Sequence, residues 1–303
     1  MTTPTTPQPA GLRFVSADER LSRPPAVKMA LLGPSGSGKT YLARSLDPKT
    51  TLFLDGEAGT RSLGSWGGRV LELLPTATAL GLHPWELCRA VACLLSGPDT
   101  SDYERQPSGL IPGPYSPEAY ATYKSRLGDP AELFGTIRTL FVDSITVVSR
   151  WSFAWADAHE ASISDKGKKD TRGAYGLHGR EMVRWLTRVQ HAPYNVIAAG
   201  ILDKQKDDLN RITWEIQIEG GKAGRELPGI FDNVVSLGRF DLADDPVTGA
   251  KTMQFNPDGG TIRGMVCTQN PWGLLAKDRS SQLDMVEPAD LGKLIEKIGR
   301  VIH

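Results

Sequence analysis

The sequence predicts an α/β fold: a mainly parallel sheet with helices on both faces and an antiparallel extension toward the C-terminus. Three features lead to this prediction. Short apolar runs that suit buried strands alternate along the chain with segments of helical periodicity. The first run, Met29–Leu32, ends in a glycine-rich turn, and Lys39 then opens a segment that can be helical. Near the end, Lys251–Phe255 and Thr261–Cys267 flank a turn-prone Asn-Pro-Asp-Gly-Gly sequence and are expected to pair as a hairpin.

Length and composition limit the class of protein. With 303 residues the chain can bury a large core, and we expect one domain over residues 26–302 after a disordered, Thr/Pro-rich tail at residues 1–25. Lysine plus arginine and aspartate plus glutamate number 35 each, so a strongly basic, non-specific nucleic-acid binder is not indicated. No apolar run approaches the roughly 18 residues of a membrane span. The start has no leader-like pattern, so we expect a cytoplasmic protein.

The cysteines and histidines show no metal-ligand spacing. Cys88, Cys93 and Cys267 are odd in number and lack a C-x-x-C pair, so they are expected to be reduced core residues. The histidines considered are expected to be structural or exposed: His83, His159, His178 and His191.

The other elements follow in order along the chain. Further buried strands are expected at Thr51–Asp55, Arg69–Leu74, Thr136–Val142, Tyr194–Leu202, Arg211–Ile218 and Phe231–Phe240. Helices are expected at Pro84–Leu95, Thr146–Glu160, Tyr175–His191 and Glu287–Ile302. The proline- and glycine-rich stretch from Ser96 has no apolar period, which predicts a long loop or an insertion at about residues 96–130.

The glycine-rich turn has the pattern G-x-x-x-x-G-K-T of a phosphate-binding P-loop, against the alternative of a simple surface turn. Glycines let the backbone curl around an anion, because a Cβ would block both the backbone angles and the close approach. Lys39 would then reach the β- and γ-phosphates of ATP, and the Thr40 hydroxyl would hold Mg²⁺. The residues expected to bind the nucleotide are Gly33, Pro34, Ser35, Gly36, Ser37, Gly38, Lys39, Thr40 and Tyr41.

Two carboxylates can complete such a site. Asp143 follows the apolar run Thr136–Val142, which places it at the carboxyl edge of the sheet, where it would bind Mg²⁺. Its alternative role is to cap the helix that follows. Glu57, just past the strand Thr51–Asp55, is the candidate for activating the attacking water. Asp55 competes for that role, and Glu57 could also be an ordinary loop carboxylate.

The order of GPSGSGKT, FLDGEAGT and LFVDSIT resembles the ATPase core of RecA-type recombinases. The resemblance implies that Glu57, in the family's D-x-E position, activates water and that Asp143, in its V-D-S position, supports Mg²⁺. The segment AKDRSS is similar to a late K-x-[KR] pair of the family, which implies that Lys277 and Arg279 reach the ATP of a neighbouring subunit. The protein is thus expected to be a Mg²⁺-dependent, DNA-stimulated ATPase that forms a homo-oligomer with ATP at its subunit interfaces.

The resemblance also implies two DNA-binding loops around the strand Tyr194–Leu202. One would lie at Ser162–Tyr175, and the other, at Asp203–Arg225, would include the glycine-rich GGKAGR. Between Glu160 and Arg225 there are 12 lysines and arginines against 9 acidic residues, so the net charge of +3 is mild and a solvated loop is the alternative. The implied contacts to single-stranded DNA are Lys166, Lys168, Lys169, Arg172, Lys222 and Arg225.

A closer resemblance, from about Val27 to Ile302, is to short RecA-like, AAA-type ATPases of bacteriophages that are linked to single-strand annealing and recombination. The shared segments are the P-loop, FLD-x-E, VDS, LPG with FDNVV, and A-K-D-R. They imply a phage-encoded protein of the host cytoplasm, with a single-strand-binding protein as a further partner. The chain departs from RecA at Gly200–Gln205: the position at the end of the switch strand has no glutamine, so either Gln205 is the displaced glutamine or ATP is coupled to DNA in another way. The chain also has no evident N-terminal polymerising helix.

Three other classes remain open. A nucleotide-switched assembly or motor ATPase would use the same P-loop without DNA contact. A metabolite kinase would need an arginine-rich lid, but residues 96–130 hold only Arg105 and Arg126. An AAA+ ATPase is the third class, although Lys277 and Arg279 follow the last strands and do not end a helix before a lid domain.

Overall fold

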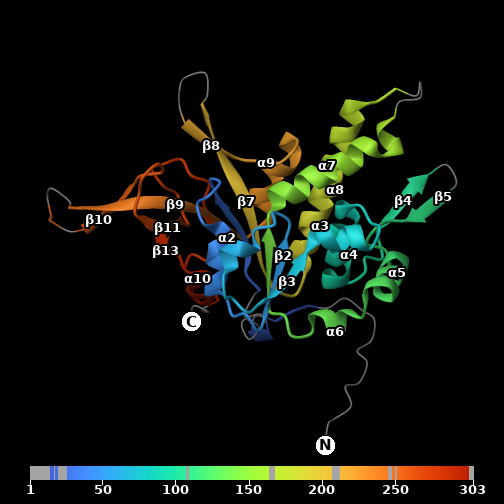
Figure 1. Cartoon of the computed structure of the whole chain (residues 1–303), viewed down its shortest axis with the longest axis horizontal. Helices are drawn as coiled ribbons and strands as arrows, with labels where there is room; N and C mark the ends of the chain where they lie inside the picture. The colour runs from blue at the N-terminus through green and yellow to red at the C-terminus, as the bar shows by residue number, and fades with distance from the viewer. Residues whose placement is uncertain are drawn as a thin grey trace, which may run out of the picture.

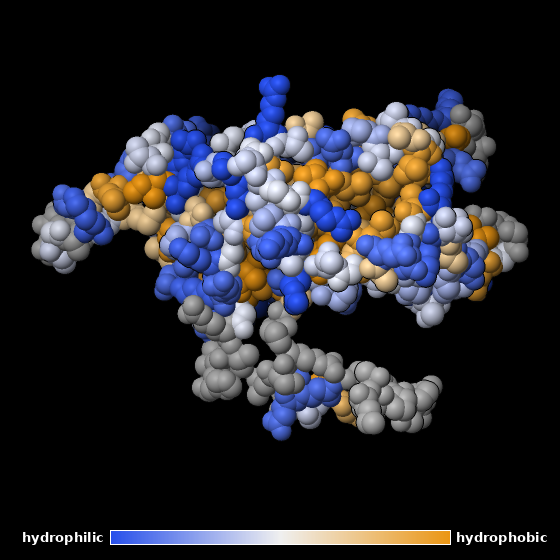
Figure 2. Space-filling model, turned by 60° about the horizontal axis from the view of Figure 1, so that its bottom comes forward, coloured by the Kyte–Doolittle hydropathy of each residue, from blue (hydrophilic) through white to orange (hydrophobic). Residues whose placement is uncertain are grey.

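The computed structural model describes residues 14–16, 18–19, 26–106, 109–163, 168–206, 212–244, 248–249 and 251–299. The predicted N-terminal tail therefore lies almost wholly outside the described residues. A central sheet is flanked by helices, with an arm formed by β9 and β10 on one side and a hairpin of β7 and β8 above the body (Figure 1). Seen from the lower side, hydrophilic residues cover much of the surface, and hydrophobic residues show between them and along the arm (Figure 2).

The centre of the fold is an 11-stranded, mostly parallel sheet. Its main path has the order β13-β11-β9-β1-β7-β6-β2-β3, and the run from β9 to β3 is parallel throughout. This confirms the predicted fold class, a parallel core with antiparallel strands toward the C-terminus. The parallel strands are β1 (Lys28–Gly33), β2 (Thr51–Asp55), β3 (Arg69–Glu72), β6 (Thr139–Asp143), β7 (Asn195–Lys206) and β9 (Asn233–Asp244).

The antiparallel strands do not form the predicted hairpin. In the described structure β10 (Lys251–Phe255) and β11 (Ile262–Val266) each pair with β9 and not with each other. The reason is that β9 has 12 residues, and β1 pairs only with Asn233–Ser236 at its start. The rest of β9 therefore accepts both strands. The shorter antiparallel strands are β8 (Ile212–Ile216) on β7, β12 (Lys277–Asp278) on β9 and β13 (Val286–Pro288) on β11.

Helices bury both faces of the sheet, which explains the continuous apolar runs of its strands. All six residues of β1 are buried. Ala30 and Leu32 join a cluster with the helices of one face, while Met29 and Leu31 join a cluster with those of the other. The three cysteines are buried and free, as predicted. The first face carries α3 (Leu73–Ala79), α4 (Pro84–Ser96), α7 (Ile145–Ala158) and α8 (Thr171–His191), and the second α2 (Lys39–Leu42) and α10 (Leu291–Ile298).

The prediction of a long loop after Ser96 is wrong, because much of this stretch has regular structure. Two of its prolines, Pro117 and Pro130, open helices, where the missing N–H group costs nothing. Ser116 and Asp129 accept the N-terminal hydrogen bonds of the same helices. High proline content here marks helix starts. The elements are β4 (Tyr103–Gln106) with β5 (Gly109–Pro112), then α5 (Pro117–Leu127) and α6 (Pro130–Phe134).

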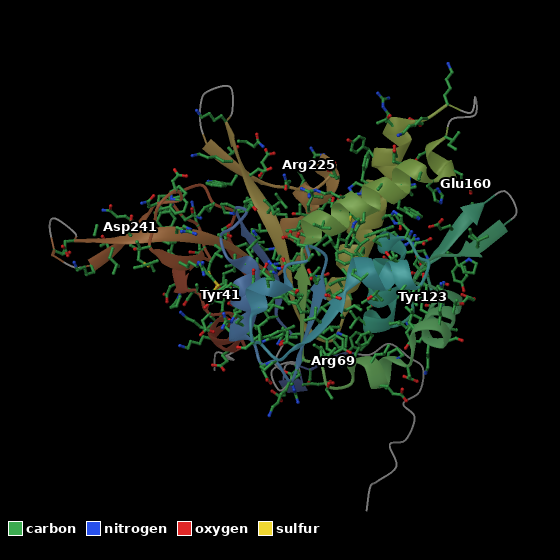
Figure 3. The ribbon with its side chains drawn as sticks, in the orientation of Figure 1. Tyr41, Arg69, Tyr123, Glu160, Arg225 and Asp241 are labelled. Carbon is green, nitrogen blue, oxygen red and sulfur yellow. The ribbon has the colours of Figure 1, made fainter. Side chains whose placement is uncertain are left out.

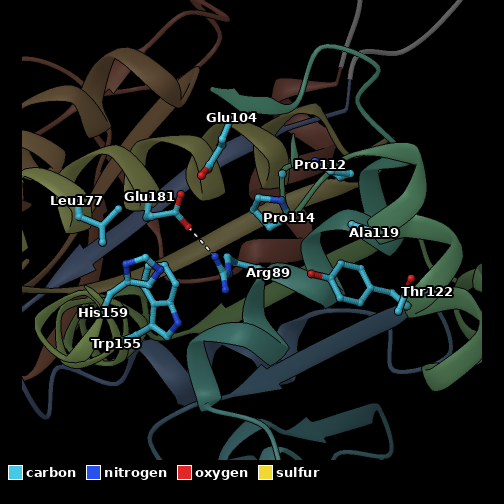
Figure 4. Close-up of a pocket in the computed structure, with 12 residues that line it drawn as sticks. Arg89, Glu104, Pro112, Pro114, Ala119, Thr122, Trp155, His159, Leu177 and Glu181 are labelled. Atoms are coloured by element: carbon cyan, nitrogen blue, oxygen red, sulfur yellow. Dashed lines mark hydrogen bonds and ion pairs between the residues drawn. The ribbon is translucent and has the colours of Figure 1, made fainter. Parts of the chain in front are cut away.

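Charged side chains attach this stretch to the body. Arg184 of α8 pairs with Asp102, beside β4, and with Glu181 of its own helix. Arg89 of α4 pairs with Glu181 at 3.1 Å and stacks on the Trp155 ring at 4.3 Å. Arg89, Glu181 and Trp155 line a cavity of about 430 Å³ between residues 96–130 and helices α7 and α8 (Figure 4). The arginines and carboxylates neutralise one another, so the network holds the two parts of the chain together.

The GGKAGR segment forms the start of a helix, in place of the predicted glycine-rich loop. Gly220, with φ of 69°, precedes α9, which spans Gly221–Ile230. Ala223 and Leu227, one turn apart, are fully buried, and α9 packs against α8. This burial outweighs the low helix propensity of glycine, since tertiary packing supplies most of the stability of a short helix. The second predicted DNA loop is therefore limited to the β7–β8 hairpin and the turn before α9.

Candidate nucleotide-binding site

The P-loop lies at the carboxyl edge of the sheet, where β1 ends between β7 and β9. Gly36 and Gly38 have φ of 72° and 99°, in the left-handed region that favours glycine. The Lys39 ammonium donates hydrogen bonds to the carbonyl oxygens of Gly33 and Pro34, at 2.8 Å and 2.9 Å. Burial lowers the pKa of Lys39, and nearby carboxylates act in the opposite direction. The loop backbone thus surrounds the Lys39 ammonium, and this arrangement suits the binding of a phosphate anion.

Thr40 and Asp143, the predicted Mg²⁺ ligands, are in direct contact. The Thr40 hydroxyl donates a 2.6 Å hydrogen bond to Oδ2 of Asp143, which is only 1% exposed. The other oxygen, Oδ1, has no hydrogen-bond partner within the described part of the chain. Burial raises the pKa of Asp143 to about 6, against the opposing effect of the Thr40 hydrogen bond. A buried carboxylate oxygen without a donor fits a metal ligand, and one carboxylate, one hydroxyl and phosphate oxygens are a common Mg²⁺ set.

Glu57 and Asp55 have different surroundings, although they are two residues apart. Asp55 ends β2 beside Asp143 of β6, and its Oδ1 accepts hydrogen bonds from the N–H groups of Glu57 (3.1 Å) and Gly59 (3.2 Å). Asp55 therefore shapes the turn that carries Glu57. The Glu57 carboxylate accepts a hydrogen bond from the Ser144 hydroxyl and borders the cavity in front of the P-loop. Geometry thus favours Glu57 over Asp55 as the group that can reach a bound water.

A cavity of about 410 Å³ opens in front of the P-loop. Its charged lining residues are Lys39, Glu57 and Arg263. Tyr41 lies at the side of α2, in the middle of the molecule as drawn in Figure 3, and also lines the cavity. The volume falls in the usual range of ligand pockets, about 300–1,000 Å³. The remaining lining residues are Ser35, Gly36, Gly38, Thr40, Gly59, Ser62 and Ile201.

Lys277 and Arg279 lie away from this cavity. Lys277 begins β12, and Arg279 directly follows it. β12 pairs with Asn233 and Val234 at the start of β9, whereas the P-loop lies past the other end of the paired segment, after the end of β1. The Lys277 ammonium donates to two carbonyl oxygens, of Pro228 (2.6 Å) and Phe231 (2.9 Å). Arg279 pairs with Asp232 at 2.9 Å. Neither residue lines the cavity in front of the P-loop.

The predicted DNA contacts are spread over three elements. Lys168 and Lys169 precede α8 and are exposed, and Lys169 pairs with Asp157 at 2.5 Å. Arg172 in the first turn of α8 is exposed. Arg225 of α9 is also exposed and lies in the upper part of Figure 3, below the β7–β8 hairpin. Lys166 and the side chain of Lys222 lie outside the described residues.

Several residues at the site were not predicted from the sequence, among them Ser144, Ile201 and Arg263. Ser144 directly follows Asp143, so the V-D-S motif contained a signal for it. Ile201 lines the cavity because β7 pairs with β1 and places Ile201 opposite Gly33. Arg263 arrives from β11, and no sequence pattern joins it to the P-loop.

A glycine-rich loop between a buried strand and a helix, with a lysine, a threonine and an aspartate from a nearby strand, defines a P-loop nucleoside triphosphatase. A family model described as an AAA domain matches residues 26–280, and the chain therefore belongs to this family and carries an AAA-type ATPase domain. A comparison with curated proteins found no match. Among the described helices, none combines the length and the apolar character needed to cross a membrane.

Proposed function

We propose that the protein hydrolyses ATP with Mg²⁺ at this site. Lys39 would bind the β- and γ-phosphates, and Thr40 and Asp143 would hold the metal, which would supply charge neutralisation. The observation that carries this assignment is the Thr40–Asp143 hydrogen bond beside the P-loop lysine, together with the Asp143 oxygen that lacks a partner in the described structure. Glu57 accepts the proton of the attacking water, and the Ser144 hydroxyl orients its carboxylate.

The second part of the proposal is that ATP controls binding of single-stranded DNA. The support is the path of β7. Its residue Ile201 lines the nucleotide cavity, and the strand continues to Lys206 and returns through β8 as a hairpin. Trp214 of β8 lines a further hollow of about 330 Å³ together with Ser35 and other P-loop residues. A conformational change at the P-loop can therefore be transmitted to the hairpin through Ile201 on β7 and Trp214 on β8.

The third part concerns assembly. A homo-oligomer with ATP at its interfaces would bring Lys277 and Arg279 of one subunit to the nucleotide of the next. Their distance from the cavity of their own subunit supports this arrangement, and Arg279 keeps 54% of its side chain exposed beside Asp232. Such an assembly on single strands would serve annealing or recombination, with a single-strand-binding protein as a partner. The alternative is a nucleotide-switched assembly ATPase that does not bind DNA.

Fluorescence anisotropy of a labelled single-stranded oligonucleotide tests the DNA proposal. Binding should strengthen with a non-hydrolysable ATP analogue and weaken with salt. Each lost phosphate contact flattens the log–log salt plot by about 0.7 for single strands. Lys168→Ala with Lys169→Ala should therefore flatten it by about 1.4 if both residues make contact.

Lys293→Ala is the matched control, because Lys293 is an exposed lysine of α10 with 81% of its side chain accessible and lies on the other face of the sheet. Its salt plot should match that of the wild type. A protein that hydrolyses ATP but binds no oligonucleotide even at low salt would reject the DNA proposal in favour of the assembly ATPase.

A further inference from the structure

An arginine from the antiparallel extension reaches the nucleotide cavity. Arg263 is the second residue of β11 and pairs in register with Arg239 of β9. In the same strand, Ser236 pairs with Leu32, the next-to-last residue of β1. Arg239 lies three residues farther along, so Arg263 stands beyond the end of β1, at the level of the P-loop. The sheet itself thus places this side chain over a loop more than 200 residues earlier in the sequence.

The contacts of Arg263 show where its charge lies. Its guanidinium carbon is 5.4 Å from the centre of the Tyr41 ring. A Cβ added to Gly38 would come within 2.9 Å of the same carbon, so the guanidinium rests directly against the P-loop backbone. Arg263 is exposed and has no ion-pair partner among the described residues. In contrast, Arg89 and Arg184 each pair with a buried carboxylate.

A bound nucleotide would need more than one positively charged side chain to balance its phosphates in this cavity. Lys39 and Arg263 are its positively charged lining residues, while Glu57 lines it and Asp143 lies just behind Thr40. A nucleotide brings several further negative charges into this space. An arginine offers a planar fork of N–H donors that matches phosphate oxygens in pairs. Arg263 lines the cavity and is in the right position to supply it.

We propose that Arg263 binds the phosphate chain of the nucleotide within the same subunit. This inference rests on the proposed ATP site. Because the guanidinium lies beside Gly38 and Tyr41, it serves the phosphates that ADP and ATP share, and it acts in binding. It thereby differs from Lys277 and Arg279, which would act from a neighbouring subunit.

Nucleotide affinity measured by isothermal titration calorimetry tests the proposal, with ADP and ATP in the presence of Mg²⁺ and no DNA. Arg263→Gln keeps most of the side-chain length and removes the charge. Because a charge-assisted hydrogen bond is stronger than a neutral one, the variant should bind both nucleotides about 10- to 150-fold more weakly. Arg263→Lys should lose less, because it keeps a point charge but not the fork.

Arg44→Gln is the matched control. Arg44 stacks on the same Tyr41 ring, at 4.8 Å, but does not line the cavity. It should bind both nucleotides as the wild type does. If Arg263→Gln binds ADP and ATP within twofold of the wild type, the inference is wrong while the ATP site stands. If the wild type binds no better than Lys39→Ala, both proposals are wrong. If the Arg44 and Arg263 variants lose nucleotide affinity equally, the loss comes from the Tyr41 ring on which both arginines stack. That result would contradict a contact between Arg263 and the phosphates.

Discussion

Replacing Asp143 by asparagine should remove a pH-dependent loss of stability from the nucleotide-free protein. Burial raises the pKa of this carboxyl from 3.8 to about 6. Since one pKa unit corresponds to about 1.4 kcal/mol, ionising the buried group lowers the free energy of unfolding by about 3 kcal/mol. The amide oxygen of asparagine can still accept the hydrogen bond from Thr40, so the contact between α2 and β6 is kept.

The direction follows from proton binding. The folded protein holds the Asp143 proton more tightly than the unfolded chain, because its pKa is raised. The contribution to stability is therefore complete below pH 3.8, declines as the pH rises toward about 6, and is lost above that value. About half of the roughly 3 kcal/mol disappears between pH 5 and pH 8.

Urea unfolding followed by tryptophan fluorescence, in EDTA, at several values between pH 5 and pH 8 gives the measurement. Relative to Asp143→Asn, the wild type should lose about 1.5 kcal/mol over this range. Adding Mg²⁺ and ATP at pH 8 should restore stability to the wild type and not to the variant. If the free energies of unfolding of the wild type and of Asp143→Asn differ by the same amount at every pH, the pKa of Asp143 is not raised. The argument that this buried carboxylate is placed to bind a metal then fails.

Three further predictions concern catalysis and the loop. Glu57→Gln should keep ATP binding and slow turnover by about 10²-fold or more, the usual scale of a positioned acid–base group, whereas unchanged turnover would move the role to Asp55. Arg279→Ala should lower turnover in the assembled protein, by up to about 10³-fold for a phosphate-stabilising arginine, and mixing it with Lys39→Ala subunits should recover part of the rate. If no ratio of the two variants restores turnover, in proteins shown to mix, Arg279 does not act on the ATP of a neighbouring subunit. Gly38→Ala should abolish binding of a labelled nucleotide, since a φ of 99° is strained for any residue with a Cβ and the added Cβ would displace the Arg263 guanidinium, and normal binding would contradict the described loop.

The core of the fold and the phosphate site could be predicted because they depend on local patterns. Buried parallel strands appear as apolar runs, and β1 with the P-loop and β6 with Asp143 are short segments of this kind. The rule that parallel strands end at one edge then brings Thr40 and Asp143 together without further information.

The features that could not be predicted depend on packing between distant parts of the chain. The helix at Gly221 forms because Ala223 and Leu227 are buried against α8, against the local propensity of its glycines. The pairing of β10 and β11 is decided by the free length of β9. Arg263 joins the site only through the registers of β1, β9 and β11, which no spacing in the sequence reveals.

Phosphate release from ATP by the purified protein, with and without Mg²⁺, tests the central claim most directly. The claim is that Lys39, Thr40 and Asp143 form a Mg²⁺-dependent ATPase site. The wild type should release phosphate only when Mg²⁺ is present, and Lys39→Ala should release none above background. Turnover by Lys39→Ala at the wild-type rate, or wild-type turnover that persists in EDTA, would contradict the account.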